Sequence, residues 1–470
     1  MDALLPLAPR EFGLYGLSLP QGPNFEDGCD VVSAWKTPRD DAFGAVLHSS
    51  SCGYQFFVMR RRVDFRFVET GGKAGLVTAE DAFDQMVKAF KIGTPLEPLR
   101  PGDRRRPRFL EFDDRTPSDI FRLLVCKGSH YAAMRVLGET YLAMPNPDRN
   151  FVSDMQTSNF DARLWELYLF ACFKEQGAKV SQDVVSPDFL IEREGAQAYI
   201  EAVTASNPSH GALGEPVRHA PEDRAERMAG APAERFAKTL HSKLQRAYQD
   251  LPHVKDFPFA LAIADFHGQS AMVWSREALP TYLYGKLAVV REGQDGPYAD
   301  SEPIERLRGN AGIPAGLFLN PEMRSLSAVI FSNAGTMAKF NRMGLLAGFA
   351  FPGIRMIRTG TIYDRTPGAL KPIEFSLDIA SEDYAALWPG GEAWCQELEI
   401  FHNPLAERPF PFSLLPGATH WFEREGEVIC QAFWKNTVTA STTLLQVPHD
   451  LEDAIEKMRF RCEGRAESSK

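Results

Sequence analysis

The sequence lacks any long run of apolar residues. One of the longest, "GLLAGFAF" (344–351), is far shorter than the roughly 20 residues that a membrane-spanning helix needs. The first residues, "MDALLPLAPREFG", also lack the basic segment and the apolar core of a signal peptide. We therefore expect no membrane partner and no secretory leader.

Patterned cysteines and histidines are missing as well. The seven cysteines show no CxxC spacing, and an odd, unpatterned number is typical of reduced thiols in a cytoplasm. The ten histidines include no HxH or HxxxH pair, which argues against a zinc site. The sequence predicts a cytoplasmic protein without structural zinc.

A positive net charge is also absent. The formal charge of −10 argues against a protein that coats nucleic acid by bulk attraction. Two arginine clusters, "RRRVDFR" (60–66) and "RPGDRRRPR" (100–108), leave local phosphate contacts open. The alternative is a solvated strand and a solvated linker, which we favour slightly because charge runs usually lie in solvent.

The chain is too long for one ordinary core, and its patterns divide it into four parts. Residues 1–110 predict a β-rich N-terminal domain with one capped helix at its end. Residues 111–150 predict a helical connector. Residues 151–290 show the order helix, hairpin, helix, strand, which is typical of a mixed α/β core. Residues 291–470 predict a C-terminal α+β region that could complete this core.

The stretch "SPDFLIEREGAQAYIEAVTA" (186–205) predicts two apolar strands around a polar turn. Each strand carries an acid where an apolar residue would pack better, Asp188 in the first and Glu201 in the second. If the tight turn is Glu194-Gly195, the two acids lie opposite each other, with Cβ atoms roughly 4.5–5.5 Å apart. A one-residue slip would instead send them to opposite faces, and exposed acids at hairpin ends are common.

Two carboxylates at that separation repel each other, and their burial is costly unless a positive charge compensates. A divalent cation such as Mg²⁺ or Mn²⁺ prefers hard oxygen ligands of this kind. The preceding helix, "NFDARLWELYLFACFKEQG" (159–177), is apolar on all sides except for Glu166. A buried Glu166 needs a metal or a basic partner, and the alternative is a side chain that reaches a solvent edge.

This order of elements resembles the PD-(D/E)xK nuclease superfamily over roughly residues 155–265. The resemblance rests on a glutamate in a helix, "PD" at 187–188 in a strand, and "EAV" at 201–203 where the motif has (D/E)xK. It implies an α/β fold with a restriction-endonuclease-like mixed-sheet core. The chain departs from the motif at Val203, which occupies the usual lysine position.

The resemblance further implies a metal-dependent nuclease that hydrolyses phosphodiester bonds. Asp188, Glu201 and the backbone carbonyl of Ala202 would hold Mg²⁺ or Mn²⁺, with Glu166 completing or supporting the site. The partner would be nucleic acid, DNA more than RNA, in defence or repair, and a homodimer stays open.

A substitute for the missing lysine is found in the next helix, "PAERFAKTLHSKLQRAYQDL" (232–251). At 100° per residue, Lys243 falls beside Phe236 on the apolar stripe and faces the core. Some members of the superfamily carry the lysine on this helix, so Lys243 is our candidate. The alternative is a lysine with its stem on the core edge and its head in water. Val203 also supports a competing function, a nuclease-fold protein that has lost catalysis and serves as a nucleic-acid-binding or scaffold module.

Two weaker candidates complete the set. Asp265 and His267 end the apolar strand "FPFALAIADFHG" (257–268), although polar residues commonly end strands. Lys339 and Arg342 follow a strand-to-helix turn whose free N–H groups could hold a phosphate of the nucleic acid. Such turns are also common in plain scaffolds.

Overall fold

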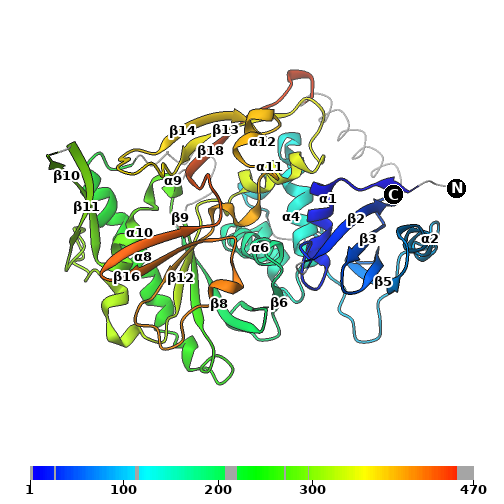
Figure 1. Cartoon of the computed structure of the whole chain (residues 1–470), viewed down its shortest axis with the longest axis horizontal. Coiled ribbons are helices and arrows are strands. Elements are labelled where there is room, and N and C mark those ends of the chain that lie inside the picture. Colours follow the sequence, from blue (N-terminus) through cyan, green and yellow to red (C-terminus); the bar gives the residue numbers. More distant parts are fainter. Residues whose placement is uncertain are drawn as a thin grey trace.

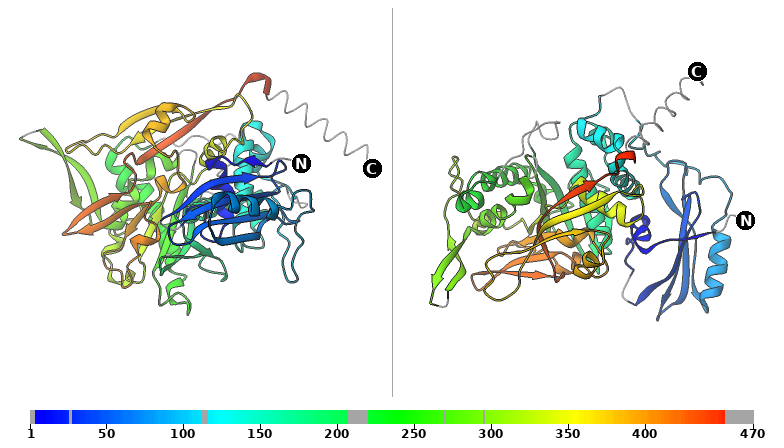
Figure 2. Two further views of the ribbon diagram at one scale, coloured as in Figure 1. Left: turned by 45° about the vertical axis from the view of Figure 1, so that its right-hand side comes forward. Right: turned by 90° about the horizontal axis from the view of Figure 1, so that it is seen from above.

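The computed structural model shows an elongated protein with a large mixed sheet at its centre (Figures 1 and 2). The N-terminal domain lies at one end and a long β-hairpin at the other. The structure describes residues 4–25, 28–111, 116–206, 220–268, 271–294 and 296–451.

The N-terminal domain is a five-stranded antiparallel sheet in the order β1-β2-β3-β4-β5. Its elements are β1 (Leu5–Pro6), α1 (Pro9–Tyr15), β2 (Cys29–Lys36), β3 (Ala42–Ser49), β4 (Gly53–Arg61), β5 (Phe67–Leu76) and α2 (Ala79–Ala89). Alternate residues of β3 pack on opposite faces: Val46 joins the cluster under α2, and Phe43 faces α1. The Thr78 side chain accepts the Asp81 N–H and caps α2. The predicted strands and capped helix are therefore present.

Three of the four arginines of the first cluster are buried rather than solvated. Arg60, Arg61 and Arg62 lie in the interior although they follow one another along β4 and its end. Their carboxylate partners are Glu97 for Arg60 at 2.9 Å, Glu139 for Arg61 at 2.7 Å and Asp64 for Arg62 at 2.6 Å. The favoured prediction of a solvated strand is wrong here, because acids compensate each of these three guanidinium groups.

The connector contains α3 (Asp119–Cys126) and α4 (Tyr131–Ala143), followed by the short α5 (Phe151–Gln156). Helix α4 packs against α11 (Met337–Leu346) of the C-terminal region. The Asn341 side chain fastens the two, since it donates to Ser129 O and accepts the Ala133 N–H. A Cβ at Gly344 would lie 2.6 Å from the Ala132 carbonyl oxygen, so glycine permits this close approach.

The central sheet has the strand order β17-β16-β15-β12-β9-β8-β7-β6. The strands are β6 (Lys179–Ser181), β7 (Phe189–Arg193), β8 (Ala196–Ser206), β9 (Phe259–Phe266), β12 (Ala328–Phe331), β15 (Glu399–His402), β16 (Thr419–Arg424) and β17 (Glu427–Ala432). Strand β9 runs parallel to β8 and β12, while β7 is antiparallel to β6 and β8. The fold is therefore mixed α/β. Residues on both sides of position 290 contribute strands, so the C-terminal region completes the sheet.

Helices cover both faces of the central part of this sheet. Helix α6 (Phe160–Glu175) packs on one face, and α8 (Ala231–Leu244) and α10 (Ala278–Tyr284) pack on the other. In β9, Ala262 points towards α6 and Ile263 towards α8. All eight residues of β9 are buried, as expected for a parallel strand between two helical layers.

Two smaller sheets complete the chain. Strands β14-β13-β18 form a three-stranded antiparallel sheet, and β10-β11 form the hairpin at the end of the molecule. The remaining bounds are α7 (Arg224–Ala229), α9 (Ala271–Ser275), β10 (Lys286–Gly293), β11 (Gly296–Pro303), β13 (Arg355–Ile362), β14 (Ile373–Asp378), α12 (Glu382–Leu387) and β18 (Val438–Gln446).

Candidate active site

The hairpin β7-β8 has the predicted register. Its turn residues Glu194 and Gly195 have φ values of 51° and 78°, the pair of positive angles that a tight type I′ turn requires. The first residue of β7, Phe189, lies opposite Ile200 in β8. A one-residue slip is thereby excluded, and the two acids of the hairpin come to the same face.

Asp188 lies immediately before β7. Its Oδ2 accepts the backbone N–H of Ala202 at 2.7 Å. Burial raises the pKa of Asp188 well above its usual range, and the nearby charges of Glu166 and Glu201 raise it further. The carboxylate is thus held in place close to two other acids, whose effect the charge of Lys243 opposes.

Glu201, in the middle of β8, is buried. Its Oε1 accepts two hydrogen bonds, from Lys243 Nζ and from Tyr248 Oη, each at 2.8 Å. Its Oε2 is buried and has no hydrogen-bond partner among the described residues. An orphaned carboxylate oxygen next to a second acid is the kind of position that a cation would fill.

Lys243 reaches this site from the last turn of α8. Val203 is only 3% exposed and packs against Phe236 and Leu240 beneath the same helix. A lysine at position 203 would have to displace this packing, whereas Lys243 brings an ammonium to Glu201 from above the sheet. The structure therefore places Lys243 where the helical phase predicted it.

Glu166 enters from α6, on the other face of the sheet. Arg163, one turn earlier, donates from Nη1 to both Glu166 oxygens, at 2.9 and 3.2 Å, and also pairs with Asp154. Burial raises the pKa of Glu166 to about 7; Arg163 opposes this shift, while Glu201 and Asp148 add to it. The expected partner of Glu166 is thus an arginine.

The sequence did not predict two residues of the site, Arg163 and Tyr248. Arg163 and Glu166 have the i, i+3 spacing of helical ion pairs, which could have indicated the contact. Tyr248 lies in a short 3₁₀ turn after α8, outside any periodic element, so its contact with Glu201 depends on the tertiary fold.

The acids fit a divalent cation as a pair rather than as a cluster. Within the described ranges, no group of three or more His, Cys, Asp or Glu side chains is arranged to hold a metal. Mg²⁺ commonly binds through one or two carboxylates and keeps several waters, so Asp188, Glu201 Oε2 and the predicted Ala202 carbonyl would be the donors of such a site. Glu166, bound at both oxygens by Arg163, is better placed to support the site than to be a ligand.

Lys339 and Arg342 do not have the predicted role. Both lie on α11 in the interior, where Lys339 is 0% exposed. The Glu392 carboxylate lies 2.8 Å from Lys339 and 2.7 Å from Arg342, and Lys339 also pairs with Glu397. Because buried acids already satisfy these cations, they are not available to a phosphate of a nucleic acid.

The second weak candidate, at the end of β9, is also buried. Asp265 Oδ1 lies 2.7 Å from His267 Nδ1 and 3.7 Å from Arg235 Nε. The hydrogen bond from His267 and the charge of Arg235 oppose the effect of burial and lower the pKa of Asp265. His267 and Arg235 thus compensate the Asp265 carboxylate on its Oδ1 side.

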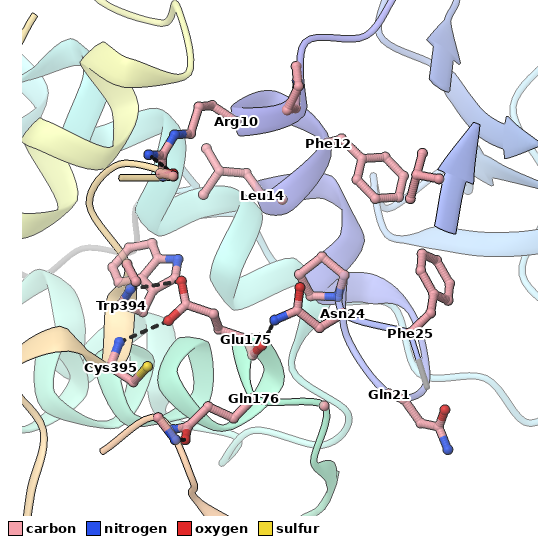
Figure 3. Close-up of a pocket in the computed structure, with 18 of the residues that line it drawn as sticks. Arg10, Phe12, Leu14, Gln21, Asn24, Phe25, Glu175, Gln176, Trp394 and Cys395 are labelled. Atoms are coloured by element: carbon pink, nitrogen blue, oxygen red, sulfur yellow. Dashed lines mark hydrogen bonds between the residues drawn. The ribbon is translucent and has the colours of Figure 1, made fainter. Parts of the chain in front are cut away.

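A large hollow lies away from the acids, between the N-terminal segment and the C-terminal end of α6 (Figure 3). It has a volume of about 1510 Å³. Glu175 accepts the backbone N–H groups of Trp394 and Cys395, and Arg10 donates to the Glu392 carbonyl. These polar groups hold segments of the chain together, so the hollow is a junction rather than a convergent chemical site.

Comparisons with family models, with curated proteins and with solved structures yield no match. Among the described helices, none has the length and apolarity needed to cross a membrane. Any functional inference therefore rests on the geometry of this chain.

Proposed function

We propose that the chain is a metal-dependent nuclease with a restriction-endonuclease-like core, which hydrolyses phosphodiester bonds in DNA. The observation that carries the proposal is the contact between Lys243 Nζ and Glu201 Oε1 at 2.8 Å. It joins a helix to a strand 42 residues away and supplies the cation that the motif lacks at position 203. The opposed acid of the hairpin, Asp188, completes the arrangement.

Each residue of the site has a distinct task in this proposal. Asp188 and Glu201 would hold Mg²⁺ or Mn²⁺, which when bound lowers the pKa of a water and stabilises charge on the phosphate. Lys243 orients the attacking water and donates hydrogen bonds to it. Tyr248 fixes Glu201 through its hydroxyl, and Arg163 fixes Glu166.

A second candidate, a nucleic-acid-binding module without catalysis, has its own supporting observation. Arg163 and Lys243 already compensate Glu166 and Glu201, respectively, so the cluster is partly neutral without a metal. Buried ion pairs of this type also occur in purely structural roles. This candidate predicts binding of DNA without cleavage.

Metal dependence tests the proposal directly. Purified protein should cleave plasmid or linear DNA in the presence of Mg²⁺ or Mn²⁺, and EDTA should stop the reaction, because in this proposal the bound metal activates the water and stabilises charge on the phosphate. Gel analysis of DNA over time is the measurement. Equal cleavage in EDTA would rule out the mechanism, and inert protein on DNA and RNA would favour the binding module.

The displaced lysine is tested in the same assay. Lys243→Ala should reduce the cleavage rate by roughly 10²-fold or more, the usual scale for a group that positions water or transfers protons. DNA binding should change much less. Lys238→Ala is the matched control on the same helix, since Lys238 is 62% exposed and pairs with Glu234 instead. Normal cleavage by Lys243→Ala would assign the task to another group.

A further inference from the structure

The second arginine cluster of the sequence lines a small pocket. The pocket has a volume of about 190 Å³ and lies between residues 102–107 and the loop 145–149 that follows α4. Two aspartates and six arginines are among its lining residues; the arginines are Arg62, Arg66, Arg104, Arg105, Arg106 and Arg149. Such a density of guanidinium groups is unusual in a chain with a net charge of −10.

Three of these arginines build the wall of the pocket. Arg62 is compensated by Asp64 and Asp103, and Arg105 by Glu111. The Arg106 guanidinium donates to backbone carbonyls at the end of α4 and in the loop that follows it. Their charges and hydrogen bonds are committed to the fold.

The other three arginines have N–H donors that the described part of the fold does not use. Arg66 donates from Nε to the Leu142 carbonyl at 3.3 Å. Arg104 and Arg149 are exposed, and the structure shows no hydrogen bond or ion pair between either one and the residues it describes. Guanidinium groups that line one pocket and keep N–H donors available match the oxygens of a phosphate, which they can bind in a bidentate manner.

The electrostatics of the pocket also favour an anion. Burial lowers the pKa of Arg66, and the charge of Arg62 lowers it further. Burial likewise lowers the pKa of Arg106 to about 9, with Arg66 adding to the shift. The positive charges therefore repel one another, and a bound anion would relieve that repulsion.

The two aspartates of the pocket reduce its charge without cancelling it. Asp103 is bound to Arg62 and accepts the Arg100 N–H. Asp148 accepts the Asn150 N–H at 2.7 Å, at the start of α5. Neither carboxylate is paired with Arg104 or Arg149 in the structure.

The pocket borders the candidate active site. Asn146, on its rim, donates to the Gln182 carbonyl at 3.2 Å, in the segment that leads to Asp188. The charge of Asp148 is close enough to Glu166 to raise the pKa of that carboxyl. These two links bring the pocket to the side of the candidate active site that holds Glu166 and the segment before Asp188.

We propose that the arginine pocket, formed by Arg66, Arg104 and Arg149 above the wall of Arg62, Arg105 and Arg106, binds a phosphate group of the nucleic-acid substrate. The inference rests on the proposed function, because it gives the same site a contact for the strand beside the hydrolysed bond. The phosphate is either internal to the strand or a 5′-terminal monophosphate, and both present the same oxygens to the guanidinium groups.

Binding measured without cleavage tests the pocket. Fluorescence anisotropy with a labelled single-stranded and a double-stranded oligonucleotide in EDTA compares wild type with the double variant Arg104→Ala/Arg149→Ala. Loss of two phosphate contacts should weaken binding roughly tenfold and reduce the slope of log affinity against log salt by about 1 to 2. Arg104→Lys/Arg149→Lys should keep much of the salt dependence, because the charge remains.

Arg291→Ala is the matched control. Arg291 is an exposed arginine on the β10-β11 hairpin, which lies at the opposite end of the molecule from the N-terminal domain (Figure 1). Its removal should leave binding unchanged. Equal binding by wild type and Arg104→Ala/Arg149→Ala would overturn the proposal, as would wild type that binds neither oligonucleotide.

A second comparison identifies the phosphate. If the pocket holds a 5′-terminal phosphate, wild type should bind a 5′-phosphorylated oligonucleotide more tightly than its 5′-hydroxyl form, and Arg104→Ala/Arg149→Ala should lose this difference. If the phosphate is internal, both forms should bind alike and both should weaken in the variant. If the arginine pocket binds the oligonucleotide but the protein never cleaves DNA, this inference stands and the proposed nuclease activity is refuted. If the protein cleaves DNA but Arg104→Ala/Arg149→Ala binds like wild type, only the pocket is refuted.

Discussion

Asp188→Asn should abolish DNA cleavage and leave the melting temperature of the metal-free protein unchanged or raise it. Asparagine can still accept the Ala202 N–H through its amide oxygen, so the local hydrogen bond survives. It carries no charge, so the repulsion from Glu166 and Glu201 disappears. Loss of activity together with retained stability is the signature of a residue that serves chemistry rather than folding.

The effect on stability should depend on pH in a defined direction. A carboxyl whose pKa is raised by folding stabilises the protein fully below its ordinary pKa, and this contribution is lost as pH rises through the raised value. The melting temperature of Asp188→Asn relative to wild type should therefore increase from about pH 4 towards pH 7. Differential scanning fluorimetry in EDTA over this range is the measurement.

Added metal provides the control. Mg²⁺ or Mn²⁺ should raise the melting temperature of wild type, since a ligand that binds only the folded state stabilises it, and should have little effect on Asp188→Asn. A large loss of stability in the variant at every pH would mark Asp188 as a structural hydrogen-bond acceptor instead.

The parts of the site that the sequence predicts are those set by local geometry. The register of the hairpin follows from a two-residue turn at Glu194 and Gly195, whose positive φ values leave little freedom in strand pairing. The inward position of Lys243 follows from the helical phase of an apolar stripe. Both inferences need only a few neighbouring residues.

The parts that the sequence did not predict depend on contacts between distant segments. Arg342 appears available to a ligand until its partner Glu392, 50 residues away, is placed beside it. The same applies to Arg61, whose acid Glu139 is 78 residues away. The local sequence around a charged residue is the same whether its side chain faces solvent or a buried acid. Its role is therefore known only once the fold places its partner.

The central sheet illustrates the same limit on a larger scale. Strand β9 pairs with β12, which belongs to the C-terminal region, and β15 and β16 follow still later in the chain. Strand β9 is visible in the sequence as an apolar run, but strand order depends on long-range pairing. A boundary at residue 290 therefore cuts through one sheet.

Glu392→Gln should destabilise the C-terminal region by about 3–5 kcal/mol, the scale for removing one partner from a buried ion-pair network. Glu392 is fully buried, and its carboxylate binds Lys339 and Arg342 on α11 and the Tyr384 hydroxyl on α12. These contacts hold its pKa well below the usual range despite burial, so the carboxylate is charged at neutral pH. Glutamine leaves buried cations without their compensating charge. Urea unfolding followed by tryptophan fluorescence is the measurement.

The control for this variant is Glu302→Gln, which removes an exposed acid that pairs with Arg291 on the β10-β11 hairpin. Surface ion pairs contribute about 0–1 kcal/mol, so its unfolding should be nearly unchanged. Combining Glu392→Gln with Arg342→Met should recover part of the loss, because removing both partners costs less than removing one. A loss below about 1 kcal/mol in Glu392→Gln would mean that Glu397 alone compensates the cations. DNA cleavage by folded Glu392→Gln should stay normal, because this cluster on α11 is separate from Asp188 and Glu201 and only stabilises the fold.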